Sequence, residues 1–129
     1  MNLKHLKLAL GLRSLRGMLD PIAGQLERYL DLLSSRQKLV ASNIANADTP
    51  GYHTRDIDFR AELDKASLSG APEIKDVEGL YVKNDGNNVS IDRESRMLAE
   101  NALQFNVASS LVREQLKQVR MAISEGAGQ

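Results

Sequence analysis

Cysteine and tryptophan are absent from this 129-residue sequence, and aromatic residues make up only 4% of it. Without cysteine the chain cannot form disulfides, thiolate nucleophiles or cysteine-ligated zinc and iron–sulfur sites. The few aromatic residues and the formal net charge of zero also argue against a base-stacking or broadly cationic nucleic-acid binder. We therefore expect no nucleic-acid partner, and the length fits one domain of roughly 100–150 residues.

Sequence patterns typical of catalytic or cofactor sites are also missing. No phosphate-binding GxxxxGKS/T, dinucleotide-binding GxGxxG, GxSxG or HExxH stretch occurs. His53 lies near Asp56 and Asp58 in the sequence, but a solvent-exposed turn explains these residues better than a metal site, because three such side chains specify a metal loosely. We predict no enzymatic activity, no catalytic residue, no cofactor and no metal site.

Long hydrophobic runs are absent as well. An apolar run at residues 8–12 is interrupted by Arg13 and is too short for the core of a signal peptide. No stretch approaches the roughly 20 apolar residues that cross a bilayer. We expect that export of this chain, if it occurs, uses a route that reads an uncleaved sequence.

Charge is distributed unevenly along the chain. Residues 1–16 contain four basic residues and no acid, whereas residues 48–92 contain five basic and ten acidic residues. Solvated surface charge explains this layout, and so does contact of a basic arm with an acidic surface on a neighbouring copy, with a membrane or with another protein. Residues 1–19 are predicted to be a basic amphipathic arm, because four leucines recur at helical spacing: Leu8, Leu12, Leu15 and Leu19.

An orderly helical pattern covers residues 20–48. Asp20 can cap this helix, and Pro21 suits its first position, where the missing N–H would be unpaired in any case. A helix with one apolar stripe needs another helix to cover it. Apolar or seam positions recur at three- and four-residue spacing: Ile22, Leu26, Tyr29, Leu30, Leu33, Gln37, Val40, Ile44 and Ala47.

A second long helix is predicted over residues 92–125. Asp92 can cap it, Glu94 suits the positive end of its dipole, and Gly126 is expected to end it. The predicted fold is mainly α, with two long terminal heptad helices packed as a coiled-coil-like pair. Both seams include small or polar residues, so other copies of the chain can complete them. The seam positions of this helix follow a regular heptad: Leu98, Ala102, Phe105, Ser109, Val112, Leu116, Val119 and Ile123.

Residues 49–91 are predicted to form a turn, a linker and a short β-hairpin between the helices. The Thr-Pro-Gly sequence at residues 49–51 suits a type II turn. A short helical turn through residues 59–66 and a linker rich in Ser, Gly and Pro follow. The hairpin is predicted to have strands at residues 80–83 and 89–91 around an Asp-Gly turn.

Three stretches of the chain carry specific patterns. Residues 39–52 read LVASNIANADTPGY, residues 55–59 read RDIDF, and residues 85–94 read DGNNVSIDRE. Small residues and two evenly spaced asparagines before the turn let another backbone approach and offer it amide groups. Over about residues 20–125, these stretches resemble the signature of bacterial flagellar rod, hook and hook–filament junction proteins. The short rod proteins, which lack large inserted domains, are the most similar.

This resemblance implies a structural subunit of the proximal rod in the flagellar basal body. Such a subunit is exported uncleaved by the flagellar type III secretion apparatus. It polymerises in the periplasm into a drive shaft and export channel that transmits torque from the motor to the hook. The implied partners are copies of itself, other proximal rod proteins, and the export-gate and adaptor proteins at the base. The basic arm is a candidate for contact with the gate or with the membrane.

The resemblance also implies which residues fix the turn and the subunit contacts. They lie in the three stretches described above, and their expected roles are hydrogen bonding and packing. The positions are Asn43, Asn46, Thr49, Pro50, Gly51, Tyr52, Arg55, Asp56, Phe59, Asn87, Val89, Asp92 and Glu94.

Two other interpretations are open at this point. A soluble helical adaptor or type III secretion chaperone is also small, with polar seam positions that can hold one partner helix. A different short proximal rod subunit shares the first stretch, although RDIDF and DGNNVSID favour the interpretation above. Presence in assembled basal bodies separates a rod subunit from an adaptor.

Overall fold

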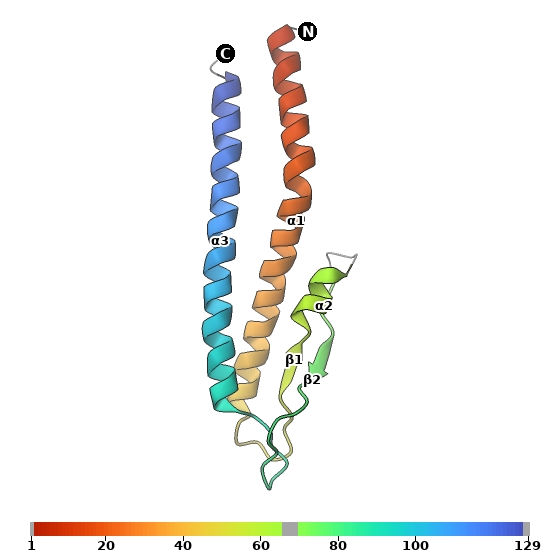
Figure 1. The fold of residues 1–129 in the computed structure, drawn as a ribbon, viewed down its shortest axis with the longest axis vertical. Coiled ribbons are helices and arrows are strands. Elements are labelled where there is room, and N and C mark those ends of the chain that lie inside the picture. Colours follow the sequence, from red (N-terminus) through yellow and green to blue (C-terminus); the bar gives the residue numbers. More distant parts are fainter. Residues whose placement is uncertain (1, 66–69, 128–129) are drawn as a thin grey trace.

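The computed structural model describes residues 2–65 and 70–127, apart from the side chains of residues 12, 14–16 and 18–20. Two long helices lie antiparallel and side by side, so that both termini are at one end of an elongated molecule (Figure 1). A small two-stranded sheet and a short helix lie against the other side of the first helix. The elements are α1 (Leu3–Ala45), β1 (Arg55–Ile57), α2 (Phe59–Asp64), β2 (Ile74–Asp76) and α3 (Ile91–Ala127). The predicted mainly α class, with a paired set of terminal helices and a short antiparallel sheet in the middle, is confirmed.

Helix α1 is longer than the sequence pattern predicted. It begins at Leu3, where the Asn2 side chain accepts a hydrogen bond from the backbone N–H of Lys4, and it runs without a break to Ala45. The predicted start at Asp20 and the separation of residues 1–19 as an arm outside the helix were wrong. Pro21 removes one backbone hydrogen bond inside α1 and its ring crowds the preceding turn, but the helix-forming residues on both sides of it continue the helix.

Two sides of α1 are covered. Leu33 and Val40, both predicted seam residues, are buried on the side that faces α3. On the other side, Leu32 and Leu39 form the small hydrophobic core with Ile57 of β1, and Phe59 and Leu63 of α2 pack against it. The α1 helix therefore lies between α3 and the middle segment.

Helix α3 begins and ends slightly outside its predicted limits. Ser90, not Asp92, caps it, because the Ser90 hydroxyl accepts a hydrogen bond from the backbone N–H of Arg93 at 3.3 Å. Asp92 lies exposed in the first turn. Gly126 does not end the helix but lies within it, where a methyl group in place of its hydrogen would push aside the end of the flexible Leu8 side chain of α1. Leu8 of α1 therefore packs directly on Gly126 near the ends of the two helices.

The face of α3 that meets α1 is not its apolar seam. Glu94, Asn101 and Ala108 are buried toward α1, and the Asn101 amide donates hydrogen bonds to the Leu33 carbonyl and the Gln37 side chain, both at 3.0 Å. Four of the predicted seam residues remain between 39% and 53% exposed, namely Leu98, Phe105, Leu116 and Ile123. The helices pair as predicted, but α3 is rotated so that much of its apolar stripe faces outward.

The strands are not at the predicted positions. β1 pairs with β2 in antiparallel register, with Asp56 opposite Lys75, and α2 lies between the two strands in the chain. Residues 80–83 and 89–90 form no strand, and residue 91 begins α3 instead. Two asparagines explain this difference. The Asn87 side chain accepts from the Val89 N–H, which a hairpin ladder would use, and the Asn88 side chain accepts from the Thr54 N–H instead and holds this loop against residues 52–54.

The turns of the middle segment are close to prediction. Tyr52 N–H donates to the Thr49 carbonyl at 3.2 Å, and Gly51 has a φ of 73°, as a type II turn requires. The Asp-Gly turn is also present, with Gly86 at a φ of 85°. The short helix α2 ends at Asp64, so most of the predicted helical turn forms. Residues 66–69, which include the start of the predicted linker, lie outside the described residues.

Candidate functional site

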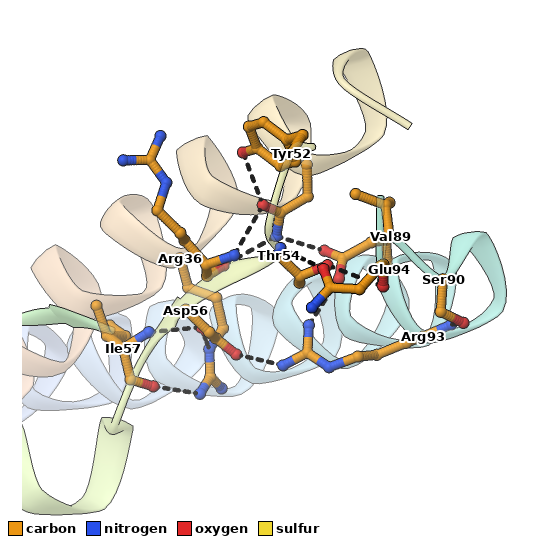
Figure 2. Close-up of polar contacts among 12 residues, drawn as sticks. Arg36, Tyr52, Thr54, Asp56, Ile57, Val89, Ser90, Arg93 and Glu94 are labelled. Atoms are coloured by element: carbon orange, nitrogen blue, oxygen red, sulfur yellow. Dashed lines mark hydrogen bonds and ion pairs between the residues drawn. The ribbon is translucent and has the colours of Figure 1, made fainter. Parts of the chain in front are cut away.

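The three patterned stretches meet where α1 ends and α3 begins (Figure 2). We call this region the helix-end junction: the last turn of α1, residues 46–57, and residues 85–94. Backbone from three separate parts of the chain comes together here, and buried polar side chains supply most of the hydrogen bonds between them.

Asn43 lies at the centre of the junction and is only 1% exposed. Its amide nitrogen donates to the Arg55 carbonyl at 2.9 Å and to Glu94 Oε2 at 3.1 Å. Its amide oxygen accepts from the Tyr52 hydroxyl at 3.0 Å and from Arg55 N–H at 3.1 Å. An amide has two donor positions and two principal acceptor positions, and all four are used. No other residue type of this size offers the same set.

A chain of alternating charges crosses the junction from α1 to α3. Asp56 accepts from Arg36 Nε at 3.1 Å and from Arg93 Nη2 at 2.8 Å, and Arg93 Nη1 donates to Glu94 at 2.6 Å. The positive charges of the two arginines balance the negative charges of the two carboxylates, and this balance offsets the energetic cost of burying Glu94. Burial acts to lower the pKa of Arg93, but hydrogen bonds to Asp56 and Glu94 outweigh this effect and raise its pKa. Arg93 therefore stays charged.

Asn87 fixes the loop after α1 in a similar way. Its side chain is fully buried and donates to the carbonyls of Asn46 and Thr49 at 2.8 and 2.9 Å, while its oxygen accepts from Val89 N–H at 2.8 Å. Asn46 in turn donates to the Ser42 carbonyl at 2.8 Å and accepts from the Thr49 hydroxyl. The two asparagines thus hold the end of α1 and the start of the turn in one arrangement.

Two glycines allow the turns of the junction to touch. Gly51 N–H donates to the Asp85 carbonyl at 2.9 Å, and a Cβ atom on Gly86 would lie 3.3 Å from the Gly51 Cα. Both glycines have positive φ angles. A side chain at Gly86 would therefore be strained in backbone conformation and crowded by backbone atoms.

A second buried ion pair ties α2 to α1. Arg28 Nη2 lies 3.1 Å from Glu62 Oε2, with both side chains buried, and Arg28 Nη1 donates to the Gly70 carbonyl at 2.7 Å. The hydrogen bond from Lys65, followed by that from Glu73 N–H, lowers the pKa of Glu62. One carboxylate therefore holds together α1, α2 and the segment leading to β2.

Most of the predicted site residues do meet in the junction. Arg55 takes part through its backbone, and Val89 through its buried side chain and its N–H. Phe59 lies outside the junction, against Tyr29 and Arg36, with a ring-centroid distance of 5.2 Å to Tyr29. Pro50 and Asp92 are exposed, and within the described residues neither side chain makes a hydrogen bond or an ion pair with the buried groups of the junction.

The sequence patterns missed four members of the network. Thr54 N–H donates to Asn88 Oδ1 at 2.6 Å, and both residues are buried. Arg36 and Arg93 complete the chain of charges through Asp56. Arg36 precedes Asn43 by seven residues, which is two helical turns, and this spacing was a usable signal for a shared face.

No group of three His, Cys, Asp or Glu side chains that could hold a metal occurs within residues 2–65 and 70–127. His53 is exposed, while Asp56 is engaged by two arginines. In the same described part of the chain, none of the helices combines the length and apolar character that a membrane span needs.

Helices α1 and α3 form an elongated pair that buried hydrogen bonds hold together at one end, and the seam of α3 that faces away from α1 is apolar. These features define a structural protein that works in an assembly. A family model described as flagella basal body rod protein matches residues 30–53, the part of α1 and the turn that builds the junction. The chain is 32% identical over 137 aligned positions to the flagellar basal body rod protein FlgB of Salmonella typhimurium, which covers 84% of this chain and 99% of that protein.

Two further relatives agree. FlgB of Escherichia coli is 33% identical over 84% of this chain and 99% of its own length, and FlgB of Borrelia hermsii is 33% identical over 74% and 90%. The chain belongs to the FlgB family of flagellar basal body rod proteins. It is a structural, non-enzymatic component of the flagellar basal body rod, as the resemblance of its motifs implied, and it assembles with other rod subunits.

Proposed function

We propose that this chain is a subunit of the proximal rod, where it polymerises in the periplasm into the drive shaft and export channel that carries torque from the motor to the hook. It reaches that place uncleaved through the flagellar type III secretion apparatus. Its neighbours are copies of itself, other proximal rod proteins, and the export-gate and adaptor proteins at the base.

The outward-facing seam of α3 is the observation that carries this proposal. Leu98, Phe105, Leu116 and Ile123 are at least 39% exposed, although they recur at heptad spacing along one stripe. Within one chain α1 instead contacts the polar and small side of α3, through Asn101 and Ala108. Apolar stripes of this length on a small protein mark interaction surfaces, and a heptad stripe suits packing against a helix of a neighbouring subunit.

The junction supports the same proposal from inside the subunit. Asn43, Asn46, Thr49, Gly51 and Asn87 act by fixing the relation of the two helices, so that every copy presents the same outer surfaces. The exposed positions Pro50, Arg55 and Asp92 are left for contacts between subunits. In this proposal the thirteen motif positions divide into those that set the shape and those that meet neighbours.

Substitution of one seam residue tests the proposal. Leu116→Asp places a charge on the exposed seam, whereas Gln118→Asp places the same charge two residues away on an exposed polar position and is the matched control. In cells whose own gene is deleted, we expect Leu116→Asp to reduce motility and recovery of the chain in purified basal bodies by about tenfold or more, because a charge buried between helices is unfavourable. Gln118→Asp should restore both.

Two outcomes would reject the proposed function. If the deletion strain still builds complete rods and hooks, the chain is not a required rod subunit. If the protein is absent from basal bodies but is recovered in a soluble complex with one exported partner, the adaptor or chaperone interpretation is correct. Circular dichroism of both variants checks that the helices are intact.

A further inference from the structure

The row of α3 that faces α1 consists of polar and small residues. Glu94, Asn101 and Ala108 are buried against α1 and recur every seven residues. Gly126 follows Ala108 by 18 residues, which is five helical turns, and Leu8 of α1 packs on it. The contact between the two helices therefore runs along one row of α3 that contains no large apolar side chain.

Asn101 is the polar member of this row beyond the helix-end junction. It is only 5% exposed, and its amide nitrogen donates to the Leu33 carbonyl and to the Gln37 side chain, both at 3.0 Å. Its amide oxygen is also buried and accepts no hydrogen bond from any of the described residues. A buried amide with an unpaired oxygen is less stabilising than an apolar side chain of similar size. The stability of the helix pair therefore does not explain why asparagine occupies this position.

A more apolar face of α3 lies directly beside Asn101. Leu98 precedes it by three residues and Phe105 follows it by four, so both lie about 40–60° to the same side of it around the helix. They are 39% and 49% exposed. Rotation of α3 about its own axis by about 50° would bury Leu98 and Phe105 against α1 and turn Asn101 away from it. The observed pairing thus uses the less apolar of two neighbouring faces.

We propose that Asn101 sets the rotation of α3 about its own axis and thereby keeps the apolar seam of α3 free for neighbouring subunits. A single buried asparagine between paired helices can fix their orientation at a cost in stability. Glu94 fixes the same row at the junction through Asn43, and Asn101 repeats this anchor two turns further on. Among the described residues, no hydrogen bond joins α3 to α1 beyond Asn101. The inference rests on the proposed function, in which the seam meets other subunits.

The absence of cysteine allows the rotation to be measured with pairs of introduced cysteines. Leu8→Cys with Gly126→Cys reports the observed rotation, because a Cβ atom at position 126 would lie 3.7 Å from Leu8 Cγ, which suits a disulfide. Leu8→Cys with Ile123→Cys reports the rotated state, since Ile123 lies on the same side of the row as Phe105 and is 50% exposed. After oxidation of the purified full-length protein, we expect the first pair to form at least five times as much intrachain disulfide as the second.

Asn101→Leu should reverse this ratio, because leucine cannot make the two hydrogen bonds and α3 then gains by turning its seam toward α1. Asn106→Leu is the matched control, since it makes the same change at an exposed position of α3 and should leave the ratio unaltered. Asn101→Ala removes the bonds without adding a large apolar group and should bring the ratio close to one. This second variant keeps the test decisive if the leucine variant fails to fold.

Assembly provides the second readout. In cells whose own gene is deleted, we expect Asn101→Leu to reduce recovery of the chain in purified basal bodies by about tenfold, while its midpoint of urea unfolding stays equal or rises. A residue that only stabilised the fold would lower that midpoint and the recovery together. Asn106→Leu should change neither quantity.

Four outcomes overturn the inference. These are a ratio near one in the native background, a ratio unaltered by both substitutions of Asn101, a lowered unfolding midpoint that accompanies the loss of assembly, and normal assembly despite a reversed ratio. Each of them leaves the proposed rod function intact. Equal behaviour of Leu116→Asp and Gln118→Asp in basal bodies would instead remove the evidence for that function, whatever the disulfide ratio.

Discussion

Replacement of Asn43 is the most direct test of the helix-end junction. Asn43→Ala leaves the Tyr52 hydroxyl, the N–H and carbonyl of Arg55, and Glu94 Oε2 without the amide that they bond. A buried polar group that loses its partner costs about 1–3 kcal/mol, and water entering the space recovers part of that cost. We therefore expect a loss of about 3–5 kcal/mol from a total stability of about 5–15 kcal/mol.

Asn46→Ala is the matched control on the same helix. Asn46 is only half-buried, and its amide bonds one carbonyl of its own helix and one hydroxyl. We expect this variant to lose about 1 kcal/mol. Urea unfolding followed by circular dichroism measures both free energies of unfolding. A difference of less than about 1 kcal/mol between the two variants would refute the central role of Asn43.

Asn43→Asp adds a pH signature to the same test. The new carboxylate keeps the two acceptor bonds but faces Glu94, which lies 3.1 Å from the amide nitrogen of Asn43 in the native chain. This like charge and burial raise the pKa of the new carboxyl in the folded state. The folded variant then binds more protons than the unfolded chain, so its stability deficit relative to the native protein should shrink as the pH falls from 7 toward 5. A deficit that does not change with pH would contradict this assignment of the contact.

Three further predictions concern other contacts. Gly86→Ala should cost about 1–2 kcal/mol more than Gly79→Ala in urea unfolding, because both glycines have positive φ but only Gly86 meets backbone within 3.3 Å; equal losses would contradict this. Gly126→Val should separate the helix ends, and faster amide hydrogen exchange in residues around Leu8 is the expected readout. Glu62 has a lowered pKa in the folded chain, so it stabilises the fold above its ordinary value of 4.5 and that contribution disappears as the pH falls through the lowered value; Glu62→Gln should therefore lose less of its melting temperature than the native protein on acidification from pH 7 to 3.

The heptad pattern predicted two long paired helices, but it could not predict which faces meet. Periodicity locates apolar residues and assumes that they cover one another, whereas here Asn101 of α3 occupies the contact and Phe105 faces outward. The start of α1 was missed for a related reason. Asp20 and Pro21 form a good local start signal, and the longer run of helix-forming residues before them overrides it.

The sequence predicted where the candidate site lies better than it predicted which residues bond to each other there. Patterned stretches drew attention to Asn43 and Asp56, and the structure brings both into one junction. Sequence spacing could not pair Asp56 with Arg93, because that contact spans 37 residues and depends on how the loop after β2 returns to α3. The strands were misplaced because the residues on either side of Asn87 are of types common in strands. The Asn87 side chain instead bonds the Val89 N–H that a hairpin ladder would use.

A mechanical consequence follows from the position of the junction at one extreme of the helix pair. Helix α3 has 37 residues and is about 55 Å long, so each degree of tilt at the junction displaces its far end by about 1 Å. Asn43 and the charged residues beside it fix this angle at one end, and the contacts of Asn101 with Leu33 and of Gly126 with Leu8 maintain it along the pair. If copies line a tube, as proposed above, the angle that these buried hydrogen bonds set between the helices contributes to the distance of the termini from the tube axis, and hence to the width of the bore.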